Sequence, residues 1–489
     1  MKRKKIISEI SITIIFLIIA TFGYFTVSYS ADIGDGTFPA RVENTNIVPF
    51  VDKSGFLDKA STLAESFCLI GTLDTCNGGE VVSYDTDNNG FVEVIYEKKL
   101  SGVYPAIFYE NRNGNFTLVH TLGVYGPVWD VGDFDGDDKA DLLTQYVNEV
   151  RIYESPDANS YPTTLVWSAP LSAPIWCHAK GGLDLDRDGM KEIIVVNNGF
   201  DHTVRIYEND GDNLYQLVYE TPVIPGPQSS VLTGDFDNDG LVEFLAAHRG
   251  GAPMIIYENI SDNNYQQTAV VAFDKDNGYA GLGDDLDGDG LQELILGGEI
   301  LSDCRDYVTF FESDADNSFI ETYEIEFPFD NVCGNLVRPS AGNVVGDVNS
   351  ELVLARYRDW RVYEPTGDNQ YEEIYSQEEP SRLAGQLFLA ETNGNGYQEI
   401  IIASRYIGLT KVYEARESCF ICGDVDGSGS VNVADLTYLV DYLFFDGPPP
   451  LVMEAANADG EGGVNVADLD YMVNYLFFGG PKPDCAPIE

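Results

Sequence analysis

Residues 184–192 read Asp184-Leu185-Asp186-Arg187-Asp188-Gly189-Met190-Lys191-Glu192, which places acids at positions 1, 3, 5 and 9 and glycine at position 6. This pattern recurs roughly every 50 residues. Further copies begin at Asp85, Asp133, Asp235 and Asp285, a weaker copy begins at Glu391, and a damaged copy that has lost the spacing lies near residues 343–351. The chain therefore contains seven copies of one unit.

Each unit has the pattern of four short strands. A short apolar run such as Ile193–Val196 follows each acidic loop, and an aromatic–Glu pair such as Tyr207-Glu208 comes about ten residues later. A turn rich in Asn, Asp and Gly follows several of these pairs, and a further strand-like run follows the turn. Four strands over roughly 40–50 residues are typical of a propeller blade. An open solenoid of stacked units is the alternative.

The two ends of the repeat region favour a closed ring. The seventh unit ends near Glu417 without a fourth strand, whereas Ser66–Leu73 precedes the first unit and resembles the fourth strands elsewhere. We predict that Ser66–Leu73 completes the last blade of a mainly β, seven-bladed β-propeller over residues 66–417. An open solenoid gives no reason for a strand to be missing at one end and spare at the other.

The acidic loops have the composition of calcium sites. Calcium takes six to eight oxygen ligands and tolerates irregular geometry. Side chains at positions 1, 3 and 5 converge when the loop curls, glycine at 6 permits the turn, and a carbonyl at 7 and the acid at 9 complete the shell. At this point the sequence resembles the FG-GAP repeats of integrin-type propellers over about residues 66–417. Simple polar turns are the alternative interpretation.

The resemblance implies one set of ligands for each loop. They are Asp85, Asp87, Asn89 and Glu93; Asp133, Asp135, Asp137 and Asp141; Asp184, Asp186, Asp188 and Glu192; Asp235, Asp237, Asp239 and Glu243; Asp285, Asp287, Asp289 and Glu293; and Glu391, Asn393, Asn395 and Glu399. The second loop has Asp138 where glycine is usual, and the lower charge of the last loop implies weaker binding or none. We expect the sixth copy, around Asn343 and Asp347, to be empty. Calcium is expected to stiffen the blades, and ligand bridging is the alternative role.

A different repeated motif ends the chain. Residues 424–435 place oxygens at positions 1, 3, 5, 9 and 12 of a twelve-residue loop with glycine at 6, as in an EF-hand loop, and an amphipathic helix follows. The unit then occurs a second time. The expected ligands are Asp424, Asp426, Ser428, Asn432 and Asp435, and then Asn457, Asp459, Glu461, Asn465 and Asp468. With the blade loops, this gives at most about eight calcium ions.

Paired loop–helix units that lack a preceding helix resemble a type I dockerin over about residues 419–486, within an expected domain of residues 418–489. The resemblance implies a small α-helical calcium-binding domain that binds a cohesin-type scaffold protein. Its two near-identical halves would be able to dock either way round. The family often carries hydroxyl residues at loop positions 10 and 11, whereas this chain has Val433-Ala434 and Val466-Ala467, which implies an apolar contact with the partner. Packing against its own propeller is the alternative.

Charge excludes two classes of partner. The chain has 28 Lys and Arg against 80 Asp and Glu, a formal net charge of −52. A nucleic-acid binder needs a basic face, and docking on anionic lipid needs basic residues too. So many carboxylates repel one another, which favours neutralisation by divalent cations.

The first residues have the pattern of a targeting segment. A basic stretch, Met1–Lys5, precedes an apolar stretch, and small residues precede Ala31. We predict a signal peptide over residues 1–30 and an N-terminal segment over residues 31–65. An uncleaved anchor is the alternative. No other stretch has the roughly 18 apolar residues needed to span a bilayer, so we expect a secreted or cell-surface chain without membrane insertion.

Eight cysteines in an exported chain indicate disulfides. Cys68–Cys76 and Cys304–Cys333 are plausible local bridges, and Cys419 or Cys422 paired with Cys485 would tie the two ends of the C-terminal domain. The chain lacks HExxH, GxSxG and phosphate-loop motifs.

Together these features favour a calcium-binding propeller that serves as a non-enzymatic binding or display module, tethered through its dockerin-like domain to a cohesin-type scaffold. A carbohydrate or protein ligand is expected on a propeller face. One alternative is a dockerin-borne polysaccharide-degrading enzyme, a glycoside hydrolase or lyase, with catalytic carboxylates among the many acids. Another is a free calcium-dependent adhesin.

Overall fold

The computed structural model describes residues 66–485 with short gaps. The gaps are residues 77–79, 99–103, 113–114, 124–125, 173–176, 198–201, 225–227, 249–253, 303, 328–336, 347–348, 357, 380–385, 404–408, 417–419, 429–430, 446, 451 and 484. The predicted signal peptide and the segment of residues 31–65 lie outside the described residues.

Within this described part, the strands form seven antiparallel sheets of four strands each. The first four sheets contain β2 (Val82–Tyr84), β3 (Glu93–Glu97), β4 (Ala106–Arg112) and β5 (Asn115–Leu122); β6 (Val128–Gly132), β7 (Asp141–Tyr146), β8 (Glu149–Glu154) and β9 (Thr164–Pro170); β10 (His178–Leu183), β11 (Glu192–Asn197), β12 (Thr203–Asn209) and β13 (Tyr215–Glu220); and β14 (Gln228–Gly234), β15 (Glu243–His248), β16 (Met254–Ser261) and β17 (Asn264–Val271).

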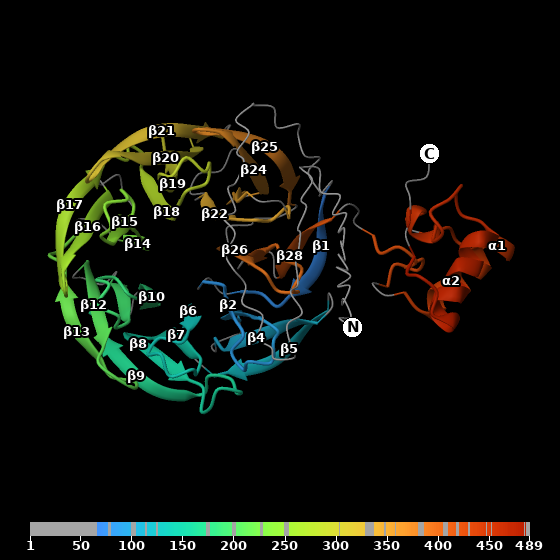
Figure 1. The fold of residues 1–489 in the computed structure, drawn as a ribbon, viewed down its shortest axis with the longest axis horizontal. Helices are drawn as coiled ribbons and strands as arrows, with labels where there is room; N and C mark the ends of the chain where they lie inside the picture. Colours follow the sequence, from blue (N-terminus) through green and yellow to red (C-terminus); the bar gives the residue numbers. More distant parts are fainter. Residues whose placement is uncertain are drawn as a thin grey trace, which may run out of the picture. The chain divides into compact units, whose positions relative to one another are not determined.

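The remaining three sheets complete the ring. They contain β18 (Asn277–Asp284), β19 (Glu293–Ile300), β20 (Arg305–Ala315) and β21 (Ser318–Glu326); β22 (Arg338–Gly342), β23 (Glu351–Ala355), β24 (Asp359–Gly367) and β25 (Gln370–Glu378); and β26 (Gln386–Ala390), β27 (Glu399–Ala403) and β28 (Thr410–Arg416) with β1 (Ser66–Leu73). Figure 1 shows the first strand of each sheet around the centre and the fourth strand on the rim. This is a seven-bladed β-propeller.

The ring closes in the predicted way. Strand β1 pairs antiparallel with β28, with Ser66 opposite Arg416 and Leu73 opposite Thr410. The first strand of the chain is thus the fourth strand of the last blade, which confirms the predicted closure and rules out the open solenoid. Because β1 and β28 are far apart in sequence, their pairing links the two ends of the repeat region.

The second strand of each blade forms the middle of the core. All residues of β3, β11, β23 and β27 are buried, because each of these strands lies between two strands of its own sheet and under the neighbouring blades. The acidic loops also contribute to this packing through their second position. Phe236, at position 2 of the fourth loop, packs with Leu294 and Phe311 of the next blade. A Cβ at Gly181 would lie 2.9 Å from the ring of Phe134, so the second and third blades approach closely at this glycine.

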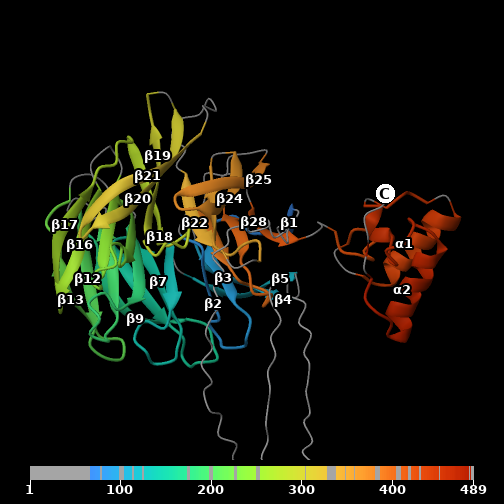
Figure 2. The same cartoon turned by 45° about the horizontal axis from the view of Figure 1, so that its top comes forward.

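The C-terminal residues form two α-helices, α1 (Val433–Phe444) and α2 (Val466–Phe478), with a short 3₁₀ helix at Glu454–Ala456. The helices pack together (Figure 2), and Leu439 and Met472 are fully buried between them. Asn432 and Asn465 cap the two helices with matching capping boxes. Within the part of the chain that the structure describes, neither helix is long and apolar enough to cross a membrane.

Candidate metal sites and binding surfaces

The acid at position 9 of each loop is the first residue of the second strand, and it is fully buried. Its carboxylate accepts a hydrogen bond from the backbone N–H at position 2. Examples are the bonds from Phe134 to Asp141 over 2.9 Å, from Phe236 to Glu243 over 2.6 Å and from Leu286 to Glu293 over 2.9 Å. Burial raises the pKa of Asp141 and Glu243 to about 8. A buried carboxylate in this position is costly unless a cation lies beside it.

Several of these acids have one oxygen with no hydrogen-bond partner. The unpaired, buried oxygens are Glu93 Oε1, Asp141 Oδ1, Glu192 Oε1 and Glu243 Oε1. The predicted ligands lie around them. Carboxylate oxygens of Asp235, Asp237, Asp239 and Glu243 all lie within 4.8 Å of one another, as do those of Asp85, Asp87 and Glu93, and those of Asp133, Asp135 and Asp141. Oxygens spaced in this way fit around an ion that takes ligands at about 2.4 Å.

Glycine at position 6 makes the turn. Gly240 has φ +95°, and its N–H donates to the carboxylate of Asp235 over 3.4 Å. The second loop keeps the same turn without glycine, because Asp138 adopts φ 67° and its N–H donates to Asp133 over 3.0 Å. The left-handed region is open to Asp at modest cost, so the departure from the pattern leaves the loop intact.

The sixth loop differs from its expected form. Glu351 accepts a hydrogen bond from the N–H of Val344 over 2.8 Å, with the same seven-residue separation as in the other loops. The prediction that this copy has lost its spacing is therefore wrong. What it has lost is an oxygen ligand at position 3, where the buried Val345 stands. Asp347 lies outside the described residues, and the prediction that this loop is empty stays a prediction.

Amide groups partly neutralise the last loop. Asn393 Nδ2 donates to Glu399 over 2.5 Å and to Glu414 over 2.6 Å, and Asn395 Nδ2 donates to Glu414 over 2.8 Å. Glu391 accepts from the N–H of Asn393 over 3.0 Å. Internal donors of this kind compete with a cation for the same oxygens.

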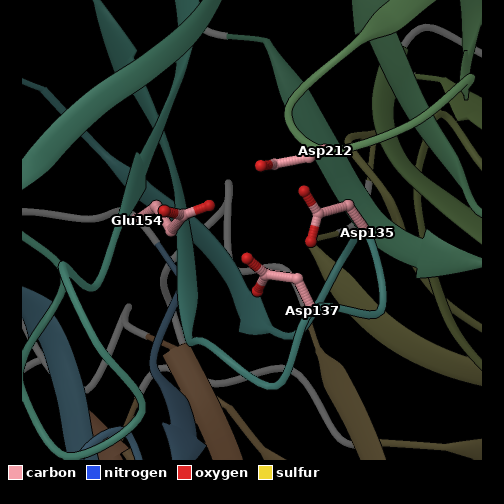
Figure 3. A group of neighbouring side chains, drawn as sticks. All are labelled: Asp135, Asp137, Glu154 and Asp212. Carbon is pink, nitrogen blue, oxygen red and sulfur yellow. The ribbon is translucent and has the colours of Figure 1, made fainter.

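Two groups of acids near the loops were missed at the sequence level. One is the Glu of the aromatic–Glu pairs, and the other is the Asp of the Asp–Asn turn between the third and fourth strands. Figure 3 shows Glu154 of β8 and Asp212 of the β12–β13 turn facing Asp135 and Asp137 of the second loop. The available signal was the recurrence of the aromatic–Glu pair in every unit and of the Asp–Asn turn in the third to sixth units. Only the ring, however, places consecutive blades side by side.

The two C-terminal loops fold alike. Asp435 accepts hydrogen bonds from the N–H groups of Asp426 and Asn432 over 3.0 and 2.8 Å. Asp468 accepts the equivalent bonds from Asp459 and Asn465 over 3.2 and 2.7 Å. Both position-12 acids are fully buried, and burial raises the pKa of each.

The other predicted ligands of these loops lie on the same turns. The N–H of Ser428 donates to Asp424 over 2.9 Å, and the N–H of Glu461 donates to Asp459 over 2.9 Å. Asn457 is buried. The repeated sequence thus gives a repeated backbone, with Asp435 and Asp468 buried at the equivalent position of the two loops.

The predicted partner-binding residues are exposed. Val433, Ala434, Val466 and Ala467 all lie on the surface at the starts of α1 and α2. Large apolar side chains are exposed at the other end of each helix, where Phe445 has 72% and Phe478 has 78% of its surface accessible. A small hollow beside α1 is lined by Ala434, Thr437, Tyr438, Val440, Asp441 and Phe445.

A pocket of about 430 Å³ lies at the centre of the propeller. The innermost strands of all seven blades line it, through Val82, Trp129, His178, Val231, Gly281, Arg338 and Leu387. Its polar side includes Glu80, whose Oε1 lies 3.8 Å from His178 Nδ1 and 4.0 Å from Arg338 Nη1. The ring of Trp129 lies 4.8 Å from that of His178. This wall combines an apolar ring with charges of both signs.

The cysteine pattern agrees with the predictions in part. Cys422 and Cys485 form a disulfide, which is one of the two pairings predicted for Cys485. Cys68 and Cys304 each take part in a disulfide as well. Cys76 is buried as a thiol, so the predicted Cys68–Cys76 bridge is wrong. Cys333 and Cys419 lie outside the described residues.

Comparisons with known proteins give one family match over part of the propeller and several structural matches at low identity. The FG-GAP-like repeat family matches residues 184–246, which hold the third and fourth acidic loops. No curated protein matches the sequence. Crystal structures of BBS1N in complex with ARL6DN, soaked with mercury or with lead, match at 10% identity and a TM-score of 0.48, covering 73% of this chain and 97% or 99% of theirs. A Bacteroides uniformis protein described as a 6-phosphogluconolactonase matches at 10% identity and a TM-score of 0.45, covering 62% of this chain and 86% of that one.

Proposed function

We propose that this propeller is an exported, calcium-binding, non-enzymatic binding module that its C-terminal domain tethers to a cohesin-type scaffold. A propeller that carries an FG-GAP-like repeat favours a binding role over a catalytic one. The loops support calcium through their clustered carboxylates and through the unpaired buried oxygens at position 9. The calcium ions stabilise the blades against carboxylate repulsion, since ligand binding to the native state adds to its stability.

The proposed tether rests on one observation, the repeated apolar surface of the C-terminal domain. Val433 and Val466 are both more than half exposed at equivalent helix starts, and Phe445 and Phe478 are exposed at the equivalent ends. Soluble domains rarely leave so many large apolar side chains exposed unless a partner covers them. The equivalence of the two halves allows one partner to bind either half after a half-turn of the domain.

The central pocket supports the binding role of the propeller. It is concave, about 430 Å³ in volume, and lined by Trp129 together with Glu80, His178, Lys180 and Arg338. Pockets with an apolar wall and a few convergent polar groups are typical of small-ligand sites. We propose that it holds a polar ligand such as the end of a glycan, whose ring stacks on an aromatic side chain and whose hydroxyl groups bond to the charged ones.

The tether is tested with the full chain and a panel of immobilised type I cohesin modules in millimolar calcium. Replacing one pair, Val433→Asp with Ala434→Lys, should leave capture largely intact because the other half remains. Replacing Val466→Asp and Ala467→Lys as well should abolish capture, since both apolar contacts would then meet charges without partners. Chelation of calcium should abolish capture by the wild-type chain.

A matched control introduces a charge on the propeller instead. Leu214 is an exposed apolar residue of the third blade, and Leu214→Asp should leave capture unchanged. Two results would contradict the tether: a wild-type chain that no cohesin captures in calcium, or a single-pair variant as inactive as the double-pair variant. The first result would favour packing of the domain on its own propeller.

A further inference from the structure

The joints between consecutive blades contain further acids, which lie beside two of the ligands of each loop. At the joint of the third and fourth blades, Asp186 and Asp188 come from the loop, Glu208 comes from β12, and Asp262 comes from the β16–β17 turn of the next blade. One carboxylate oxygen of each lies within 4.8 Å of the others. Figure 3 shows the equivalent group at the joint of the second and third blades.

An asparagine of the turn holds each joint in place. Asn263 has φ 56°, its N–H donates to Asp186 Oδ2 over 2.8 Å, and its Nδ2 donates to Glu208 over 2.7 Å. At the next joint, Asn317 makes the same bonds to Asp237 and Glu258, over 2.6 and 2.5 Å. The two donors of one asparagine therefore bring the carboxylates of two blade elements together, and the adjacent Asp adds a further negative charge.

At the joint of the second and third blades the chain supplies a lysine as its own cation. Lys139, at position 7 of the second loop, forms ion pairs with Asp137 and with Glu154, whose Oε2 lies 3.1 Å from Nζ. The ammonium thus binds acids of the joint shown in Figure 3. The third, fourth and fifth loops have Met190, Leu241 and Leu291 at position 7, which carry no charge. Their joints have the same acids without the lysine.

A buried, unpaired oxygen points to a ligand at the joint of the fifth and sixth blades. Glu312 of β20 is only 6% exposed, and its Oε1 is buried without a hydrogen-bond partner. The negative charges that act on it are those of Asp289, Asp287 and Asp368, the first two from the loop and the third from the next blade. Asn369 donates a side-chain hydrogen bond to this carboxylate. A buried carboxylate with one unpaired oxygen among three further acids is still costly unless a cation neutralises it.

We propose that a divalent cation of the calcium class bridges consecutive blades at three joints, in addition to the ions of the loops. The joint ligands are Asp186, Asp188, Glu208 and Asp262; Asp237, Asp239, Glu258 and Asp316; and Asp287, Asp289, Glu312 and Asp368. All the donors are carboxylate oxygens, which hard cations prefer. The acids at positions 3 and 5 have two oxygens each, so they can contact a loop ion and a joint ion together.

Exchanging the lysine between blades tests the proposal. Native mass spectrometry of the full exported chain in calcium counts the bound ions. Met190→Lys should lower the count by one, because an ammonium then replaces the ion at that joint. Lys139→Met should raise the count by one, because it frees the joint of the second and third blades. Met190→Leu and Lys139→Arg are matched controls and should keep the wild-type count.

A second pair of variants changes acids of a joint without changing any ligand of a loop. Asp262 and Asp212 are exposed and equivalent, and neither belongs to a loop set. Asp262→Asn should lose one ion, whereas Asp212→Asn should lose none because Lys139 already neutralises that joint. Far-UV circular dichroism checks that each variant is folded. Unchanged counts in Met190→Lys, Lys139→Met and Asp262→Asn, with a calcium-loaded wild type, would overturn the joint sites alone. A wild-type chain without calcium would overturn the loop sites as well.

Discussion

Glu243 shows how one residue couples the fold to the metal. It starts β15, is fully buried, and accepts the N–H of Phe236 over 2.6 Å with one oxygen, while the other oxygen has no hydrogen-bond partner. The first oxygen shapes the loop, and the second is available to a cation. Glu93, Asp141 and Glu192 divide their oxygens in the same way, so the strand that forms the core also carries a candidate metal ligand. At Glu293 the second oxygen instead accepts a hydrogen bond from the hydroxyl of Tyr371 over 2.9 Å.

We expect Glu243→Gln to remove one calcium ion while keeping the hydrogen bond to Phe236. At a calcium concentration tenfold above Kd, the lost ion would lower the free energy of unfolding by about 1.4 kcal/mol. In chelator, Glu243→Gln should be no less stable than the wild type, because its neutral amide needs no cation. Urea midpoints measured with calcium and with chelator test this. Glu351→Gln, in the loop predicted to be empty, is the control and should behave alike in both conditions.

At the scale of elements, the hairpin of one blade fastens the loop of the blade before it. The Asn residues at these turns have φ between 54° and 59°, as at Asn213 and Asn369, which directs the N–H toward position 3 of the neighbouring loop. The left-handed turn thus serves the hairpin and the joint at once. Asn suits the position because it tolerates positive φ and carries a second donor on its side chain.

Two substitutions at Asn317 separate these contributions. Asn317→Gly keeps the positive φ and the backbone bond to Asp237, but loses the side-chain bond to Glu258, a loss of about 1.5 kcal/mol or more for a charged acceptor. Asn317→Ala also strains the turn and should cost about 1 kcal/mol more than the glycine variant. Equal urea midpoints for the two variants would show that the turn conformation contributes nothing.

At the scale of the whole molecule, one short strand joins the ends of the ring. Phe67 of β1 is 5% exposed and contacts the rings of Trp360 and Tyr375, with centroids 5.5 and 4.9 Å away. Those two residues belong to the sixth blade, so β1 packs against a neighbouring blade as well as completing its own. Closure therefore depends on side-chain packing in addition to the ladder with β28.

We expect Phe67→Ala to lower the free energy of unfolding by about 3–5 kcal/mol, the usual cost of emptying a buried aromatic site. Leu69, on the same strand, is 51% exposed, and Leu69→Ala should change stability by less than about 0.5 kcal/mol. Denaturant unfolding monitored by tyrosine and tryptophan fluorescence compares the two variants. Similar losses in both would mean that β1 contributes only through its backbone.

The repeat spacing was enough to predict the blades, their number and the closing role of Ser66–Leu73, because a strand missing at one end and spare at the other is visible in the linear sequence. The acids at positions 1, 3, 5 and 9 were equally visible, since a tight loop brings together only residues close in sequence. The roles of Glu208, Asp262 and Lys139 were not visible, and neither was the central pocket. Lys139 meets Glu154 only when β7 and β8 pair within the second blade. The turn of Asp262 and Asn263 meets the third loop only when the ring sets consecutive blades side by side, and the pocket forms only when all seven blades surround it. No local pattern in the sequence records these long separations.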